Sequence, residues 1–304
     1  MLMATALKLA MASLRFRWRL LALTLLTLTL SITLLLGVQY LRSEVRQSFL
    51  NTLSGTDLIV GARSSPVNLL LYTVFHMGDP TANIRWDSAQ QIAQDKGVAW
   101  SVPISLGDSY RGHRVVGTDR GFLEHVRIGR QQALHLNQGD WFEDVFEVVL
   151  GAEVARKLQH RIGDDIVLAH GAGPTSFMSH ADKPFRVSGV LAPTGTPIDR
   201  AVYVSLAGLE AIHLGWEGGV PAPGRRVSAQ TARERDLTPK SITALLIGVE
   251  RKVMTFQLQR RWNTWQTEPL SAILPGVALA TLWQTLGQFE RILLGIAGLV
   301  LITS

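Results

Sequence analysis

The chain has 304 residues, with 30 lysines and arginines against 24 aspartates and glutamates, eight histidines and no cysteine. Four basic residues, Lys8, Arg15, Arg17 and Arg19, lie in residues 1–19 without a single acidic one, and they supply most of the net charge of +6. This concentration excludes a nucleic-acid surface spread over a domain. An exported domain without disulfides needs an ordinary hydrophobic core, and about 240 residues are enough to build one.

Residues 1–19 are predicted to form a cytoplasmic amphipathic helix. Leu7, Met11, Leu14 and Trp18 follow helical spacing, and the basic residues lie on a neighbouring face. An apolar stripe beside a basic face suits a helix that lies in the headgroup region of a membrane. The alternative is a basic tail without fixed structure.

The next segment, Leu20 to Tyr40, is apolar and uncharged. As a helix with a rise of roughly 1.5 Å per residue it is about 31 Å long, which matches a hydrocarbon core of roughly 30 Å. We therefore predict a transmembrane helix over residues 20–41. Because basic residues that flank a span stay cytoplasmic, the long segment after it is expected outside the cytoplasm. A cleaved signal peptide is disfavoured by the length of the run and by the lack of a small-x-small cleavage pattern.

Small hydroxyl residues share one face of this predicted span. Thr24, Thr27 and Ser31 are our helix-packing candidates, because small side chains let helices approach closely and hydrogen-bond to each other. The alternative is that each hydroxyl bonds to a carbonyl of its own helix and faces lipid.

Residues 42–287 are predicted to form a large mixed α+β domain with helical stalks. Strands and helices alternate irregularly, which favours a compact mixed domain over a doubly wound sheet. The expected strands are Val98–Leu106, Tyr110–Val116, Val148–Leu150, Asp165–Ala169, Phe185–Leu191, Ala201–Val204 and Ile242–Val249. The expected helices are Arg120–His125, Ala152–Gln159, Ser205–His213, Arg251–Trp265 and Val277–Phe289.

A second apolar run, Ile292 to Ile302, comes close to the end of the sequence. It is only about 18 Å long as a helix, which is too short to cross a bilayer. We expect residues 288–304 to be the start of a second transmembrane helix, truncated here, and the natural protein to continue. The fold class expected overall is α+β and membrane-anchored, with an amphipathic N-terminal helix, a transmembrane helix, a large external domain and the start of a second span.

Candidate chemistry is sparse in this sequence. All eight histidines lie between residues 76 and 213, and none forms an HxH, HxxH or HExxH pattern. The nearest pairs, His125 with His135 and His170 with His180, are ten residues apart. We predict scattered surface histidines and no catalytic, cofactor-binding or metal-binding residues. A metal site assembled by the fold stays open as an alternative.

Four stretches give the chain a family resemblance. They are LKLAMASLRFRWRLLALTLL, GTDLIVGARSSPVNLLLYTVFHM, EVVLGAEVARKLQHRIGDDIVLAHG and ADKPFRVSGVLAPTGTPIDRAVYVSLAGLEAI. With these stretches the chain resembles the MacB/FtsX class of ABC-transporter permease subunits over nearly all of its length. The resemblance is uninformative about substrate.

The resemblance implies a non-catalytic, multi-pass subunit of the bacterial inner membrane with its large domain in the periplasm. Its implied partners are a cytoplasmic ABC ATPase chain that binds the ATP, a second permease copy of the same or another kind, membrane lipid and, in some systems, a periplasmic protein, but no nucleic acid. Two other classes stay open. One is a membrane-anchored periplasmic binding or sensor domain, and the other is a component of a metal-handling transport system.

Overall fold

The computed structural model of the chain describes residues 11–52, 54–171, 180–217, 220–221 and 227–303. The chain divides into two compact units. One unit comprises Met1–Gln47 together with Leu282–Ser304, and the other comprises Ser48–Thr281. The candidate site lies in the second unit.

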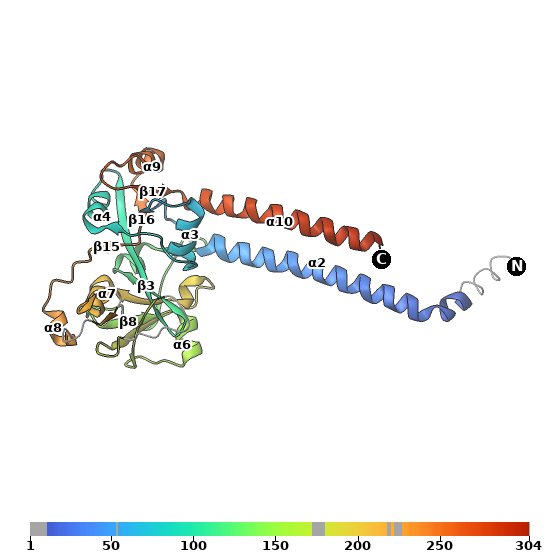
Figure 1. Ribbon diagram of the computed structural model, residues 1–304, viewed down its shortest axis with the longest axis horizontal. Helices are drawn as coiled ribbons and strands as arrows, with labels where there is room; N and C mark the ends of the chain where they lie inside the picture. Colours follow the sequence, from blue (N-terminus) through green and yellow to red (C-terminus); the bar gives the residue numbers. More distant parts are fainter. Residues whose placement is uncertain (1–10, 53, 172–179, 218–219, 222–226, 304) are drawn as a thin grey trace. The chain divides into compact units, whose positions relative to one another are not determined.

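The chain has a long helix near each end, α2 (Trp18–Thr52) near the N-terminus and α10 (Pro275–Thr303) near the C-terminus (Figure 1). Helix α2 contains the whole uncharged run and ends just before Gly55, which has a φ of 94°. Helix α10 joins two segments that the sequence predicted separately. Residues 1–10, half of the predicted amphipathic helix, lie outside the described residues.

No helix in the described part of the chain combines the length and the hydropathy that a membrane crossing requires. The transmembrane segments expected over residues 20–41 and 288–304 therefore stay predictions.

The second unit is built on an eleven-stranded mixed sheet, which confirms the predicted α+β class. Its strands follow the order β17-β1-β16-β3-β4-β12-β8-β11-β7, with β10 paired to β3 and β9 paired to β11. Neighbours are antiparallel except for two parallel pairs, β12 with β4 and β11 with β8. The sheet strands are β1 (Leu58–Ala62), β3 (Val98–Tyr110), β4 (His113–Thr118), β7 (Leu136–Gly139), β8 (Glu147–Leu150), β9 (Asp165–Ile166), β10 (Ala169–His170), β11 (Phe185–Leu191), β12 (Val202–Ser205), β16 (Ala244–Val249) and β17 (Leu270–Ile273).

Short helices and three small two-stranded ribbons complete the second unit. The helices are α3 (Pro66–Phe75), α4 (Trp86–Ala93), α5 (Gly121–His125), α6 (Ala152–Leu158), α7 (Leu206–His213), α8 (Ala229–Arg233) and α9 (Thr255–Asn263), with 3-10 turns at η1 (Pro197–Arg200) and η2 (Lys252–Met254). The ribbons are β2 (Ile84–Arg85) with β15 (Ser241–Ile242), β5 (Arg127–Ile128) with β6 (Gln132–Ala133), and β13 (Trp216–Glu217) with β14 (Val220–Pro221).

Two hydrophobic clusters cover the two ends of the sheet. Helices α4 and α9 pack on the β1, β16 and β17 end, around the fully buried Trp262. Helices α6, α7 and α8 pack on the β8, β11 and β12 end, around Phe185 and Val204. Strand β3 is long enough to pair with β16 in its first half and with β4 and β10 in its second half. It therefore joins the two ends in one sheet.

Two predicted strands are each divided into two shorter strands in the structure. A buried polar side chain divides the first, and a change of pairing partner divides the second. Ile242–Val249 is interrupted at the buried Thr243, whose hydroxyl accepts a hydrogen bond from the backbone N–H of Leu106 at 3.0 Å. Asp165–Ala169 divides because its first part pairs with β11 and its second part pairs with β3. This second division determines which strand His170 faces.

One half-buried histidine, His76, predicts a pH dependence of stability. His76 ends α3 in the left-handed region, with a φ of 55°. Burial, with a smaller effect of the nearby Arg114 guanidinium, lowers the pKa of His76 from 6.5 to about 4. The unfolded chain then binds more protons than the fold between pH 6.5 and 4. The free energy of unfolding is therefore highest above pH 6.5 and falls as the pH drops towards 4.

The comparison of the parent chain with His76→Asn checks this expectation, because asparagine tolerates a positive φ and does not titrate. Thermal unfolding of both chains should be followed from pH 7 to pH 4. We expect the parent to lose more stability than the variant over this window. Parallel pH profiles would contradict the assignment.

Candidate metal centre

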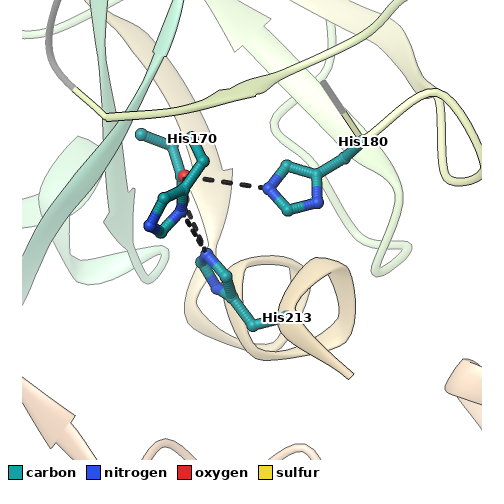
Figure 2. Close-up of side chains that lie close together, drawn as sticks. His170, His180 and His213 are labelled. Carbon is teal, nitrogen blue, oxygen red and sulfur yellow. Dashed lines mark hydrogen bonds and ion pairs between the residues drawn. The ribbon is translucent and has the colours of Figure 1, made fainter. Parts of the chain in front are cut away.

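Four side chains that are far apart in the sequence converge at one edge of the sheet. They are Asp108, His170, His180 and His213, and each offers one ligand atom within 4.8 Å of all the others. Figure 2 shows the side chains of His170, His180 and His213 lying close together.

A β-bulge and a strand pairing bring Asp108 and His170 together. Leu106 pairs with Val116 and Ser109 pairs with Arg114, so Gly107 and Asp108 together oppose one residue of β4. Such a bulge re-aims a side chain relative to regular alternation. On the other side of β3, His170 of β10 is the direct cross-strand partner of Asp108. Directly opposed residues of antiparallel strands have Cβ atoms about 4.5–5.5 Å apart, which is close enough for the two side chains to share one ion.

His213 is positioned by helix α7. Ser205 caps the start of this helix by accepting a hydrogen bond from the N–H of Gly208 at 2.9 Å. In the last turn, Nδ1 of His213 lies 2.7 Å from the carbonyl oxygen of Leu209. A carbonyl can only accept, so Nδ1 carries the proton and a neutral ring has its lone pair on Nε2. Nε2 is the atom directed at the cluster.

His180 is held by its backbone and by an indole ring. Its N–H donates to the carbonyl oxygen of Leu168 at 2.9 Å, and its carbonyl oxygen accepts from the N–H of Lys183 at 3.0 Å. The ring centroid of Trp216 lies 4.2 Å from that of His180. These contacts fix the imidazole against the sheet edge.

The separations between the ligand atoms are close to those of a tetrahedral site. Oδ1 of Asp108 lies 3.3 Å from Nδ1 of His170 and 3.9 Å from Nε2 of His180. Nε2 of His213 lies 3.3 Å from Nδ1 of His170 and 3.6 Å from Oδ2 of Asp108. Metal bonds of about 2.0–2.1 Å in a tetrahedron place neighbouring ligand atoms about 3.3 Å apart. All four ligand atoms lie within 4.8 Å of one another, and an inward movement of His180 would complete that geometry.

Within this cluster, His180 is fully buried and its ring lacks hydrogen-bond partners among the described residues. Its side chain is 0 % exposed, and neither ring nitrogen has a hydrogen-bond partner among the described residues. Leaving a buried polar group unsatisfied costs about 1–3 kcal/mol, so such groups need an explanation. The Asp108 carboxylate is equally buried, whereas the side chains of His170 and His213 are 39 % and 35 % exposed. The cluster is therefore closed on its inner side and accessible on its outer side.

The surroundings of the cluster keep the Asp108 carboxylate charged. Burial raises the pKa of Asp108, but contacts with His170 and His213 outweigh it, and the pKa falls to about 2. Burial lowers the pKa of His180 to about 4. Burial also disfavours protonation of His213, but contact with Asp108 prevails and raises its pKa. The ammonium of Lys183, whose charge also acts on His180, is paired with Asp182 at 3.1 Å.

Sequence reasoning missed this cluster. The expectation of scattered surface histidines is wrong for His170, His180 and His213, because the fold gathers them and buries one completely. The only sequence signal was the ten-residue spacing of His170 and His180, which matches no metal-binding pattern. That spacing gives no indication of Asp108 or His213.

The helix-packing candidates lie on α2. The hydroxyls of Thr24 and Thr27 each donate to carbonyl oxygens one turn earlier, those of Leu20 and Leu23, at 3.1 Å. Both threonines are exposed, and Ser31 is half-buried. The packing role of this face stays a prediction, because it concerns helices of another chain or segment.

Comparison with known proteins gives a family and two structural neighbours. The family described as MacB-like periplasmic core domain matches residues 21–247. The crystal structure of the periplasmic region of MacB from Actinobacillus actinomycetemcomitans aligns with 12 % identity and a TM-score of 0.42, covering 77 % of this chain and 93 % of that one. The extracellular domain of the noncanonic ABC-type transporter YknZ from Gram-positive bacteria aligns with 12 % identity and a TM-score of 0.39, covering 72 % and 99 %. No curated protein matches the chain.

Proposed function

This chain belongs to the family of the MacB-like periplasmic core domain, which is an ABC-transporter domain, and from that premise we propose that it is a permease subunit of an ABC transporter. In this proposal residues 1–19 are cytoplasmic, residues 20–41 form the first transmembrane helix, residues 42–287 are periplasmic and residues 288–304 begin the second transmembrane helix. The family match over residues 21–247 is the observation that carries the proposal.

The sequence and the helices support a membrane location. The run from Leu20 to Tyr40 is uncharged and about as long as a hydrocarbon core is thick, and it is preceded by four basic residues. Helices α2 and α10 lead into and out of the mixed α+β unit. A protein with one external domain between two spans has this order of elements.

The proposed mechanism is mechanical coupling. A separate cytoplasmic ATPase binds and hydrolyses ATP, and the helices pass the resulting movement to the periplasmic domain for export or extraction of a substrate. This role needs no catalytic residue in the permease chain. It does need helix contacts within a dimer of permease subunits, for which the Thr24, Thr27 and Ser31 face is our candidate.

Topology fusions test the location first. A reporter that is active only in the periplasm should be active when it is fused after residue 150 and silent when it is fused at the N-terminus. The opposite pattern would refute the topology, and activity at neither position would refute export of the domain.

A set of leucine substitutions tests the coupling surface. Replacing Thr24, Thr27 and Ser31 with leucine keeps the span apolar and preserves insertion. We expect it to weaken helix association by about 1–2 kcal/mol, at roughly 0.6 kcal/mol for each hydroxyl contact. The measurements are the ATPase activity that co-purifies with the tagged full-length protein and the amount of the second permease copy recovered with it.

Helix α2 offers a matched control for these substitutions. Thr29 and Thr33 lie on the opposite face at 100° per residue, and the hydroxyl of Thr29 also bonds to its own helix, at 2.7 Å from the carbonyl oxygen of Leu25. Thr29→Leu with Thr33→Leu should leave assembly and ATPase activity unchanged. If the triple variant behaves like this control, the coupling surface lies elsewhere.

A further inference from the structure

We propose that Asp108, His170, His180 and His213 bind one divalent transition-metal ion, and that zinc is the ion that fits best. This inference goes beyond the proposed transport function and does not depend on it.

The donor set selects the class of ion. Three imidazole nitrogens and one carboxylate oxygen are ligands that Zn²⁺ accepts in four-coordinate tetrahedral sites. Mg²⁺ and Ca²⁺ prefer sites made of oxygen ligands, of which this cluster offers few. Imidazole-rich sites also suit Cu²⁺, Ni²⁺ and Fe²⁺, but four ligands arranged near the corners of a tetrahedron favour Zn²⁺. The four protein ligands fill the coordination sphere, so the site binds and holds an ion rather than activating a water molecule.

The surroundings of the ligands match a metal site more closely than a plain polar network. The carbonyl oxygen of Leu209 orients His213 by accepting from Nδ1, which is a usual second contact of a metal-binding histidine. In a network of hydrogen bonds alone, the fully buried His180 would need a partner for at least one nitrogen, and the described residues supply none. A cation between His180, Asp108 and the other two rings satisfies Nε2 of His180 directly.

The charge of the site also accommodates a dication. Asp108 contributes one negative charge in a buried position, and an imidazole that binds a metal does so through the lone pair of its neutral ring. The ammonium of Lys183 is compensated by Asp182 and by the carbonyl oxygen of Leu214 at 3.3 Å. Because His170 and His213 are partly exposed, an ion can reach the cluster from outside the domain.

Zinc titration of the full chain tests the proposal. The protein should be purified in detergent with a tag that contains no histidine, stripped of metal with a chelator, and titrated with Zn²⁺ against a chromophoric competitor. We expect one Zn²⁺ per chain, and Co²⁺ should give the intense visible bands of a four-coordinate ion. Excess Mg²⁺ or Ca²⁺ should not displace either ion.

Single substitutions assign the ligands. His170→Ala, His180→Ala and Asp108→Asn should each lower the Zn²⁺ affinity by at least about 100-fold, because even outer contacts of metal ligands are worth about 10–100-fold. His135→Ala is the matched control, since His135 is exposed and belongs to no cluster among the described residues. It should bind zinc like the parent.

Two results would overturn the proposal. One is the absence of stoichiometric Zn²⁺ binding to the parent chain. The other is unchanged affinity in either His170→Ala or His180→Ala, with circular dichroism showing that the variant is folded. The side chain of His170 is partly exposed, so His170→Ala keeps the test valid even if His180→Ala does not fold. Failure of the transport proposal in the topology or ATPase assays would leave these outcomes unaffected.

Discussion

Replacing Trp262 with alanine is expected to lower the free energy of unfolding by about 3–5 kcal/mol, because it removes the largest fully buried side chain of the second unit. Trp262 lies on α9 and packs in the cluster that joins this helix to strands β1, β16 and β17. Its indole N–H donates to Oδ2 of Asp95 at 3.1 Å, and Asp95 is also paired with Arg261. The substitution therefore leaves a cavity and removes a polar contact that ties α9 to the turn after α4.

Phe256 provides a matched control on the same helix. Its side chain is 69 % exposed, so Phe256→Ala removes an aromatic ring without opening a cavity and should change stability by less than about 0.5 kcal/mol. The measurement is thermal unfolding of the purified full chain. We expect the midpoint for Trp262→Ala to fall by about 10 °C, at roughly 2–4 °C for each kcal/mol. Equal midpoints for the two variants would show that α9 is not part of the cooperative core.

Removing the carboxylate of Asp199 is expected to cost about 3 kcal/mol. This buried side chain accepts hydrogen bonds from the N–H groups of Thr194 and Gly195 at 2.8–3.0 Å, and from the hydroxyl of Thr194 at 2.8 Å. Asp199→Ala leaves these donors without their acceptor, and each such loss costs about 1–3 kcal/mol where water cannot replace it. The same turn contacts α6, because a Cβ added at Gly151 would lie 2.5 Å from the carbonyl oxygen of Asp199. Displacement of the turn would therefore disturb the packing of α6.

Two further aspartate variants sharpen this test. Asp199→Asn keeps one acceptor oxygen and should cost roughly half as much as Asp199→Ala. Asp236→Ala is the control, since Asp236 is exposed and accepts one backbone hydrogen bond, from Thr238 at 3.0 Å. It should cost less than about 1 kcal/mol. If Asp199→Ala unfolds at the same temperature as Asp236→Ala, the carboxylate does not hold the turn together.

The sequence predicted the elements with strong local signals. Strand β11 has the bounds expected for it, and helices α6 and α7 begin and end within one residue of the expected positions. Strand β11 alternates buried and exposed residues in its first half, and α7 has an apolar face preceded by the capping residue Ser205. Strand β2 was not predicted, because its pairing with β15 exists only through a contact between distant segments. A short run carries no periodicity by itself.

The candidate metal centre could not be predicted for a related reason. Asp108 and His170 meet through strand register and a bulge, and His213 joins them only because α7 ends beside β10. Sequence motifs identify metal ligands that lie on one helix or in one loop, because there the number of residues between the ligands determines the distance between their side chains. Here each of the four ligands lies on a different element, and spacing along the chain carries little information about their distance in space.

The bulge at Gly107 and Asp108 makes the direction of the Asp108 side chain depend on the number of residues in β3 as well as on their identity. Loss of one residue from β3 restores regular alternation, and regular alternation moves every later side chain of that strand to the opposite face. A homologue could then keep an aspartate at the aligned position and still direct it away from the histidines. One codon inserted or deleted in this strand would thus gain or lose the site in a single genetic event. We therefore expect the histidines to be retained only in those lineages that also retain the extra residue.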